Sequence, residues 1–217
     1  MNESDQGPND LQTPESGGLR IDRGFFSQGT VAVARRLLGQ LLVRRLADGT
    51  RLSGLIVEVE AYLGPEDRAA HTFGNRRTPR NESMWQRGGM AYVYFTYGLH
   101  HCFNVVTRDA QHPQAVLVRA LQPVEGIKPM AERRPAARRV TDLCSGPAKL
   151  CQALQIDRQL DGTDLVGGDS LFLEQVRRRA LPGARIAAGP RIGIDYAGDW
   201  VDVPLRFMVR SSRFASR

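Results

Sequence analysis

The sequence has few cysteines, few histidines and no long apolar segment, and each shortage excludes a class of protein. The three cysteines, Cys102, Cys144 and Cys151, are an odd number without a CxxC pair, which excludes a disulfide scaffold and favours a reducing compartment. The four histidines lack the spacing of common metal motifs, so we expect no metal site. The longest apolar run covers only a few residues, so we expect no membrane-spanning helix.

Two nucleotide-binding motifs are also missing. Neither GxGxxG nor GxxxxGK[ST] occurs, so no dinucleotide site or P-loop is expected, and we expect no cofactor. Lysine is nearly absent as well, because Lys128 and Lys149 are the only two against 28 arginines. Catalysis through a Schiff base needs an amine nucleophile, so any bond cleavage by this chain is expected to use water instead.

The charge of the chain is distributed unevenly. Residues 1–18 hold four of the 23 acidic residues and no basic one, so the rest has 30 basic and 19 acidic residues, a net charge of +11. This excess predicts an anionic partner, nucleic acid first, because arginine makes planar contacts with phosphate. A GC-rich genome would explain the preference for arginine over lysine but not the net charge.

The polar composition of residues 1–18 predicts a disordered acidic lead. Its first residues lack both a secretory signal and a mitochondrial presequence, so we expect a bacterial cytoplasm, at the nucleoid, or a nucleus in a eukaryote. Apolar periodicity then continues without a linker or repeat. We therefore predict one domain over 19–210 and a short tail over 211–217. We also expect a monomer.

Short strands outnumber helices in the expected secondary structure. We predict a helix over 31–38 with Thr30 as its N-cap and Gly39 after its end, and helices over 124–134 and 140–154. Strands are predicted over 40–46, 51–63, 90–96, 101–107, 115–121 and 205–210, the first four as two hairpins. This order predicts an α+β fold, a single domain with a mixed, mostly antiparallel sheet flanked by helices.

Two carboxylates share one face of the strand predicted over 51–63. Glu58, Glu60 and Tyr62 alternate with apolar residues, so they point to the same side. Spacing alone favours a solvated outer face for these residues. The alternative, which would give them a function, is a pocket lined by the paired carboxylates. A glycan hydrolase is a weaker alternative, because its two carboxylates should flank the sugar from opposite sides.

Aromatic and basic residues follow in the middle of the chain. The segment 91–98 holds Tyr92, Tyr94, Phe95 and Tyr97, with Tyr97 at a hairpin turn where an aromatic could enter a base stack. A loop over 75–81 carries Arg76, Arg77 and Arg80, and Lys149 lies near the start of a helix; both could contact phosphate. An ordinary core strand and an exposed loop are the plain alternatives.

Arg119 lies within an apolar strand and needs a partner if it is buried. It could form a structural ion pair, or it could pair with a catalytic carboxylate such as Glu60. The sequence leaves both possibilities open.

Taken together, these segments resemble the alkyladenine (methylpurine) DNA glycosylase family. The resemblance covers most of Leu19 to Arg210, and its strength lies in the number and order of matching motifs rather than in any one of them. The clearest are Val57-Glu58-Val59-Glu60-Ala61-Tyr62-Leu63-Gly64, Ala69-Ala70-His71, Thr78-Pro79-Arg80-Asn81, Tyr92-Val93-Tyr94, Leu117-Val118-Arg119-Ala120-Leu121 and Cys144-Ser145-Gly146-Pro147.

The resemblance implies a monofunctional glycosylase that flips damaged purines out of duplex DNA and hydrolyses the N-glycosidic bond. Alkylated, etheno and deaminated purines are the implied substrates, and base excision repair is the implied process. The alternative is a nucleic-acid-binding module without catalysis, which would gain nothing from a carboxylate such as Glu60.

Residue roles are implied by the same resemblance. Glu60 would be the general base that activates water, and Arg119 and the carbonyl of Ile194 would help to hold that water. The flipped base would lie among Tyr62, His71 and Tyr94, and Asn104 would exclude guanine by clashing with its amino group. Tyr97 would fill the gap in the duplex.

Overall fold

The structure is a computed structural model, and it describes residues 11–13, 18–96, 98 and 100–216. The strands of this part are β1 (Leu19–Arg20), β2 (Leu41–Arg45), β3 (Arg51–Tyr62), β4 (Ala91–Thr96), β5 (His100–Thr107), β6 (Gln114–Glu125), β7 (Leu171–Gln175), β8 (Ile186–Gly189) and β9 (Arg206–Val209). The helices are α1 (Arg23–Phe26), α2 (Thr30–Leu37), α3 (Ile127–Arg133), α4 (Val140–Leu143) and α5 (Pro147–Leu154).

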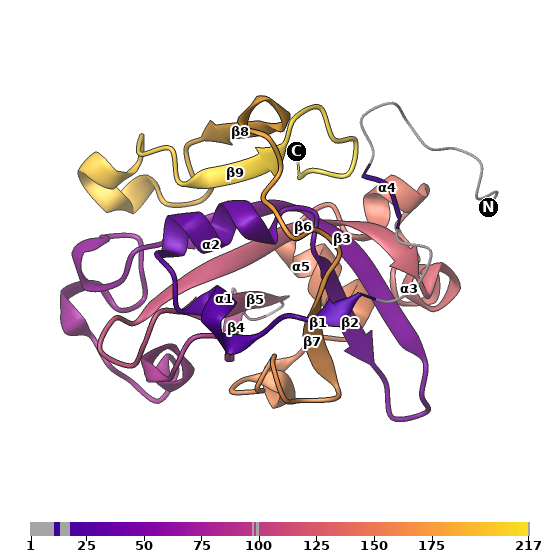
Figure 1. The fold of residues 1–217 in the computed structure, drawn as a ribbon, viewed down its shortest axis with the longest axis horizontal. Helices are drawn as coiled ribbons and strands as arrows, with labels where there is room; N and C mark the ends of the chain where they lie inside the picture. Colours follow the sequence, from indigo (N-terminus) through magenta and orange to yellow (C-terminus); the bar gives the residue numbers. More distant parts are fainter. Residues whose placement is uncertain (1–10, 14–17, 97, 99, 217) are drawn as a thin grey trace.

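The described strands form one antiparallel sheet in the order β1-β7-β2-β3-β6-β5-β4. The long strands β3 and β6 cross the centre of the molecule (Figure 1), and β9 joins β3 where β2 ends. A few helices flank the sheet, so the predicted α+β fold with a mostly antiparallel sheet is confirmed. The domain boundaries stay a prediction, although Leu11 is already buried and exchanges hydrogen bonds with the side chain of Gln122.

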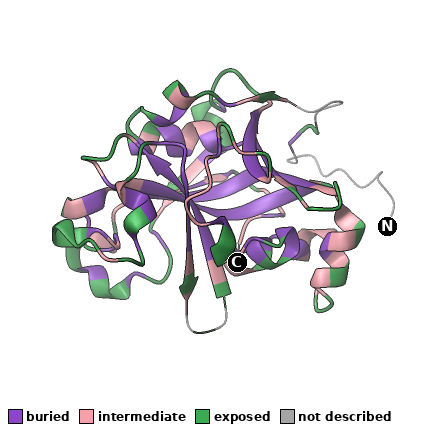
Figure 2. Cartoon of the chain, turned by 90° about the horizontal axis from the view of Figure 1, so that it is seen from below, coloured by how far each residue is buried: buried purple, intermediate pink, exposed green. Residues whose placement is uncertain are grey.

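The core lies in and on both sides of the central strands. Figure 2 shows these strands as buried along most of their length, whereas the ends of β4 and β5 project from the body. Helix α2 packs against β3 and β6 through an apolar face, and α5 packs against β5 and β6 through another. Because β3 is covered on both faces of the sheet, nearly every residue of this strand is buried.

Two predictions of helix starts need correction, and one of a helix end holds. The N-cap of α2 is Gly29, because the hydroxyl of Thr30 is used in hydrogen bonds to Thr107 and Gln114. The helix predicted over 124–134 begins only at Ile127, because β6 continues to Glu125 and the residues up to that point belong to the strand. Gly39 follows the end of α2 with a φ of 81°, as expected of a residue at that position.

The helix predicted over 140–154 is two helices. Ser145 forms a β-bridge with Ala120, and Gly146 adopts a φ of 149°, so the backbone between α4 and α5 is not helical. Beyond this break, the first residues of α5, Pro147 and Ala148, line a cavity of about 360 Å³.

Candidate functional site

The carboxylate of Glu60 lies at the centre of the sheet with no solvent exposure. Its Oε1 accepts a hydrogen bond from the backbone amide of Ile192 at 2.8 Å and lies 3.0 Å from Nη1 of Arg119. Its Oε2 accepts from the hydroxyl of Tyr62 at 2.9 Å. The alternative of a solvated face for Glu58, Glu60 and Tyr62 is therefore wrong.

Irregular strand pairing brings Arg119 to both carboxylates of β3. The register between β3 and β6 shifts on each side of Glu58, so Glu58 pairs with Ala120 and Val59 pairs with Val118. Arg119 falls between these paired positions, and its Nε donates to Glu58 at 3.0 Å while its Nη1 faces Glu60. The sequence left open whether Arg119 forms a structural ion pair or pairs with Glu60. In the structure its buried guanidinium contacts both Glu58 and Glu60.

Burial and charge act on Glu60 in opposite directions. Burial is the larger effect and raises the pKa of Glu60, and Arg119, the Ile192 amide and the Tyr62 hydroxyl offset part of that rise. The pKa of Arg119 is raised, because the pull of Glu60 and Glu58 outweighs the effect of its own burial. The pair therefore combines a fixed cation with a carboxyl group that is more basic than an exposed one.

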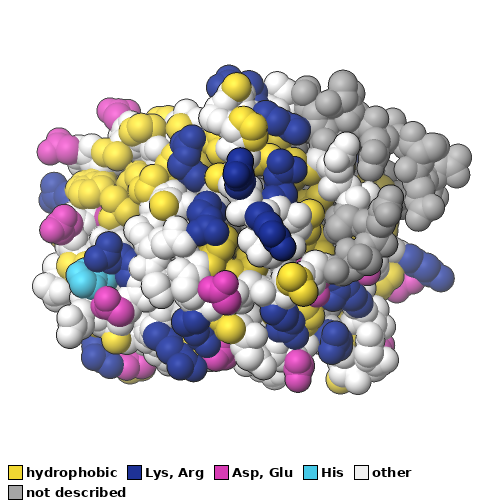
Figure 3. Space-filling model, in the orientation of Figure 1, with side chains coloured by type: hydrophobic (Ala, Val, Ile, Leu, Met, Phe, Trp, Pro, Cys, Tyr) yellow, Lys and Arg dark blue, Asp and Glu magenta, His cyan; other side chains and the backbone are white. Residues whose placement is uncertain are grey.

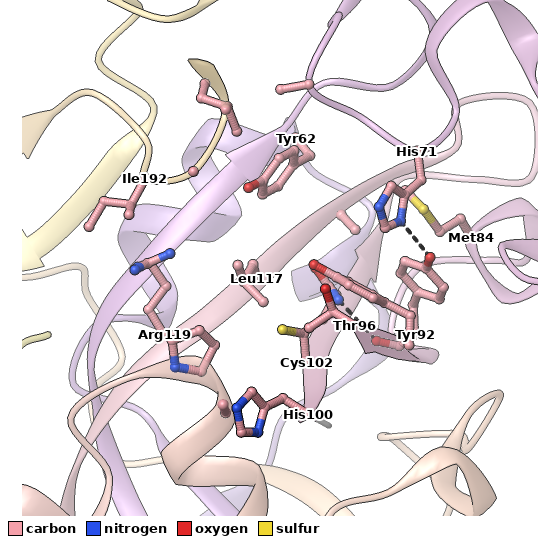
Figure 4. Close-up of a pocket in the computed structure, with 18 of the residues that line it drawn as sticks. Tyr62, His71, Met84, Tyr92, Thr96, His100, Cys102, Leu117, Arg119 and Ile192 are labelled. Carbon is pink, nitrogen blue, oxygen red and sulfur yellow. Dashed lines mark hydrogen bonds between the residues drawn. The ribbon is translucent and has the colours of Figure 1, made fainter. Parts of the chain in front are cut away.

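A cavity of about 360 Å³ opens in front of this pair. The groups that bind Glu60, which are Arg119, Tyr62 and Ile192, all line the cavity, but Glu60 itself lies behind them. Figure 4 shows Arg119 and Ile192 on one side of the cavity and His71 with Tyr92 on the other. The three groups that hold Glu60 and the aromatic groups therefore lie around one hollow.

The aromatic side of the cavity contains a neutral histidine. His71 Nδ1 lies 2.7 Å from the hydroxyl of Tyr92, and the ring centroids of His71 and Tyr94 are 4.6 Å apart in an edge-to-face arrangement. Burial lowers the pKa of His71 to about 4, with Arg80 and Arg76 adding to the effect. Above that pH the ring is uncharged, so it does not repel a cationic ligand.

The phenols stay protonated for the same reason. Burial raises the pKa of Tyr62, Tyr92 and Tyr94, so all three hydroxyls remain donors at neutral pH. Asn104 also lines the cavity, where its amide nitrogen donates to the carbonyl of Tyr92 at 3.1 Å. The structure thus gathers the predicted base-binding residues, and it adds Tyr92, whose place in the aromatic segment is the only signal for it in the sequence.

Two loops close the cavity and are joined by a second buried ion pair. Arg191 binds both carboxylate oxygens of Asp67, at 2.5 and 2.8 Å, and its guanidinium lies 4.7 Å from the ring centroid of Tyr62. Asp67 also accepts from the backbone amides of Leu63 and Ala69. This pair sets the position of the loop that carries Ile192, a contact of Glu60 that the sequence alone does not reveal.

Ile194 lies in the same loop, is buried and lines the cavity. Its carbonyl accepts a hydrogen bond from the amide of Ala197 at 2.8 Å, which leaves one lone pair for another donor. Tyr97, the residue predicted to fill the gap in the duplex, lies outside the described residues.

The basic residues predicted to contact DNA have different surroundings. Arg80 lines the main cavity and a neighbouring hollow of about 300 Å³, and Arg76 lines the second one. Arg77 is exposed and paired with Glu82, and Lys149 on α5 lies 3.4 Å from the hydroxyl of Ser145. Arg80 therefore borders the cavity itself, and Arg76 borders the hollow beside it.

The positive charge is not confined to this region. On the face seen in Figure 1, Lys and Arg side chains gather near the centre (Figure 3). Among the described residues, no group of three or more His, Cys, Asp or Glu side chains is placed to hold a metal ion, and no helix is long and apolar enough to cross a membrane.

Comparison with known proteins identifies the class to which this fold and cavity belong. Residues 24–213 match the family described as methylpurine-DNA glycosylase. The match covers most of the chain, so the chain belongs to this family.

Individual relatives show how much of a known protein the chain represents. A mouse protein named DNA-3-methyladenine glycosylase is 48% identical over 214 residues, which cover 95% of this chain and 64% of the mouse protein. The human protein of that name is 44% identical, with 95% and 71% covered. A protein of Desulfitobacterium hafniense (strain Y51) is 43% identical over 204 residues, with 91% and 98% covered. The chain thus spans under two thirds of the mouse relative but almost the whole bacterial one.

Proposed function

We propose that the protein is a monofunctional DNA glycosylase that removes damaged purines from duplex DNA by hydrolysis. The observation that carries the proposal is the position of Glu60, a desolvated carboxylate held by three donors that all line an aromatic cavity. Such burial of a charge is costly unless it is paired, and a protein that only binds nucleic acid has no use for it.

The aromatic side of the cavity suits a purine that has left its helix. Stacking on aromatic rings stabilises an extruded base by about 1–3 kcal/mol each, and flipping costs least for a mispaired or damaged base. Tyr62 and Tyr94 offer ring surface, and neutral His71 tolerates the positive charge of an alkylated purine. Alkylated, etheno and deaminated purines are the substrates we propose, and Asn104 is the group that excludes guanine.

Glu60 acts as the general base in this proposal. Water bound in the cavity, near Arg119 and the Ile194 carbonyl, gives a proton to the carboxylate as its oxygen attacks C1′ of the sugar, and the purine leaves with the bonding electrons. The hydroxyl of Tyr62 donates to Oε2 of the same carboxylate, so one side chain contacts both the proposed base catalyst and the cavity in which the purine would stack.

A lyase mechanism has no support in the described cavity. A Schiff base needs an amine, and neither Lys128 nor Lys149 lines the cavity. Arg76, Arg77, Arg80 and Lys149 are the proposed DNA-backbone contacts, and Tyr97 is the proposed wedge. The partner is duplex DNA with damaged purines, bound by a monomer.

The test is incubation with matched duplexes that contain N3-methyladenine, ethenoadenine, hypoxanthine or only normal bases, followed by alkaline cleavage at abasic sites. We expect strand breaks at the lesions and none in the undamaged duplex. Borohydride reduction during the reaction should trap no covalent protein–DNA adduct. Absence of breaks at every lesion would overturn the proposed activity, and a trapped adduct would overturn the hydrolytic mechanism alone.

A further inference from the structure

Glu58 is a second buried carboxylate in β3, and the chemistry proposed for Glu60 does not use it. Its side chain has no solvent exposure, and four donors surround it. Its Oε1 accepts from Nε of Arg119 at 3.0 Å, from Nη1 of Arg206 at 3.3 Å and from the hydroxyl of Ser216 at 2.8 Å. Its Oε2 accepts from the amide of Ser216 at 2.6 Å.

The contact with Arg119 fixes the direction of a rigid group. A guanidinium is planar, so holding its Nε at Glu58 sets the direction in which Nη1 points. That direction leads to Oε1 of Glu60, 3.0 Å away. The third nitrogen, Nη2, lies 3.4 Å from the Ser216 hydroxyl, so each nitrogen of the Arg119 guanidinium has an acceptor.

The donors to Glu58 come from the end of the described chain. Strand β9 pairs with β3 over Glu58 to Glu60, and Arg206 begins this strand. The chain then turns back after β9, so that Ser216 reaches Glu58 across 158 positions of sequence. A buried carboxylate with such partners stabilises a fold little better than an apolar side chain would, so its retention calls for another reason.

We propose that Glu58 is a positioning residue for the reaction: clamped by Ser216 and Arg206, it orients Arg119 so that this arginine holds Glu60 in place behind the cavity. The inference rests on the function proposed above. It makes the segment after β9 part of the active-site support rather than a mere continuation of the chain.

The charge of Glu58 also acts on Glu60. The groups that face Glu60 are Arg119 on β6, Tyr62 and Glu58 on β3, Tyr94 on β4, Cys102 on β5 and the amide of Ile192. Burial raises the pKa of Glu60 most, Arg119 lowers it, and Glu58 adds a smaller rise. A misplacement of Arg119 by about 1 Å is enough to slow the reaction but leaves its charge beside Glu60. Removing the charge of Glu58 therefore lowers the pKa of Glu60, and excision, which needs the carboxylate, persists to lower pH.

The main experiment compares Glu58→Gln with Glu174→Gln. Glu174 is also a buried strand carboxylate held by an arginine, Arg51, but it lies on β7 and does not line the cavity. For Glu58→Gln we expect single-turnover excision to fall roughly 10- to 100-fold because a displaced catalytic group costs about that much. Lesion-DNA affinity should be unchanged, and the acid limb of the pH–rate profile should move to lower pH.

The control separates positioning from folding. Glu174→Gln should lower the melting temperature while leaving the excision rate and the acid limb as in the wild type. Equal rate losses in the two variants, or a Glu58→Gln enzyme with wild-type rate and acid limb, would overturn the inference. A wild type that excises no lesion would instead overturn the proposed function.

Two further measurements test the inference from the donor side and by direct titration. Ser216→Ala removes one donor to Glu58 and keeps the backbone amide, so we expect a smaller rate loss, whereas Ser212→Ala in the same segment should cause none. Titration of the Glu60 carboxyl by ¹³C NMR, without DNA, should give a lower midpoint in Glu58→Gln than in wild type. An unchanged midpoint would show that the two carboxylates are not coupled.

Discussion

Two buried arginines bind carboxylates on the two sides of Tyr62, and they differ in what surrounds them. Arg191 and Asp67 form a closed pair, because the carboxylate also accepts two backbone amides and neither side chain lines the cavity. Arg119 is shared between two carboxylates, and it lines the cavity itself. Both centres are desolvated, but only one of them faces a space that a substrate can enter.

The comparison shows that burial of an ion pair does not by itself indicate a catalytic site. Arg191 and Asp67 connect the loop after β3 to the loop before β9, and both oxygens of the Asp67 carboxylate are satisfied by protein donors, whereas the buried Nε of Arg191 has no hydrogen-bond partner. At the Arg119 centre one buried arginine serves two carboxylates, a half-buried second arginine, Arg206, contacts only Glu58 of the two, and the pKa of Glu60 is raised by burial. Perturbed groups beside a cavity are the ones expected to do chemistry.

The largest expected effect is on the Arg119 side of the comparison. Glu60→Gln keeps the size and hydrogen-bonding capacity of the side chain but removes its basicity, so single-turnover excision should fall by about 10²–10⁴-fold, the usual contribution of a general base. Binding to lesion DNA, measured by fluorescence anisotropy, should persist. Excision near the wild-type rate would remove Glu60 from its proposed role.

Asp67→Asn tests the closed pair. It leaves Arg191 buried without its counter-charge, so the free energy of unfolding should fall by about 3–5 kcal/mol, the typical cost of breaking a buried pair. Urea denaturation measures this loss. A stability equal to that of the wild type would contradict the structural role of the pair, whatever happens to activity.

Tyr62→Phe gives a smaller effect with a defined sign. The ring stays, but the hydroxyl that donates to Glu60 is lost, and this hydrogen bond lowers the pKa of Glu60. Its removal should raise that pKa, so the acid limb of the pH–rate profile should move to higher pH, opposite to the shift expected for Glu58→Gln. A shift in the same direction for both variants would refute this assignment of charges.

The smallest effect concerns His71, on the aromatic side of the cavity. The pKa of His71 is lowered to about 4 by burial, so its imidazole NMR signals should stay constant from neutral pH down to about 5 and titrate near 4. Titration near the ordinary value for histidine would mean that the ring is charged in mildly acidic solution and unsuited to a cationic base.

Much of the site follows from local pattern. Alternation puts Glu58, Glu60 and Tyr62 on one face of a strand, and the structure keeps them together. The hairpin formed by β4 and β5 was likewise predictable, because its apolar runs and turn residues are local signals. The break between α4 and α5 was not, since the bridge from Ser145 to Ala120 is a tertiary contact that overrides helical periodicity.

The sequence by itself determined the family, the strands β2 to β6 and β9, and the residue types that meet around the cavity. Only the tertiary structure decided that Arg119 serves two carboxylates, that the Ile192 amide holds Glu60, and that Ser216 closes the cluster around Glu58. The physical reason is that these contacts depend on shifted strand register and on loops far apart in the chain, whereas periodicity reports only which neighbours share a face.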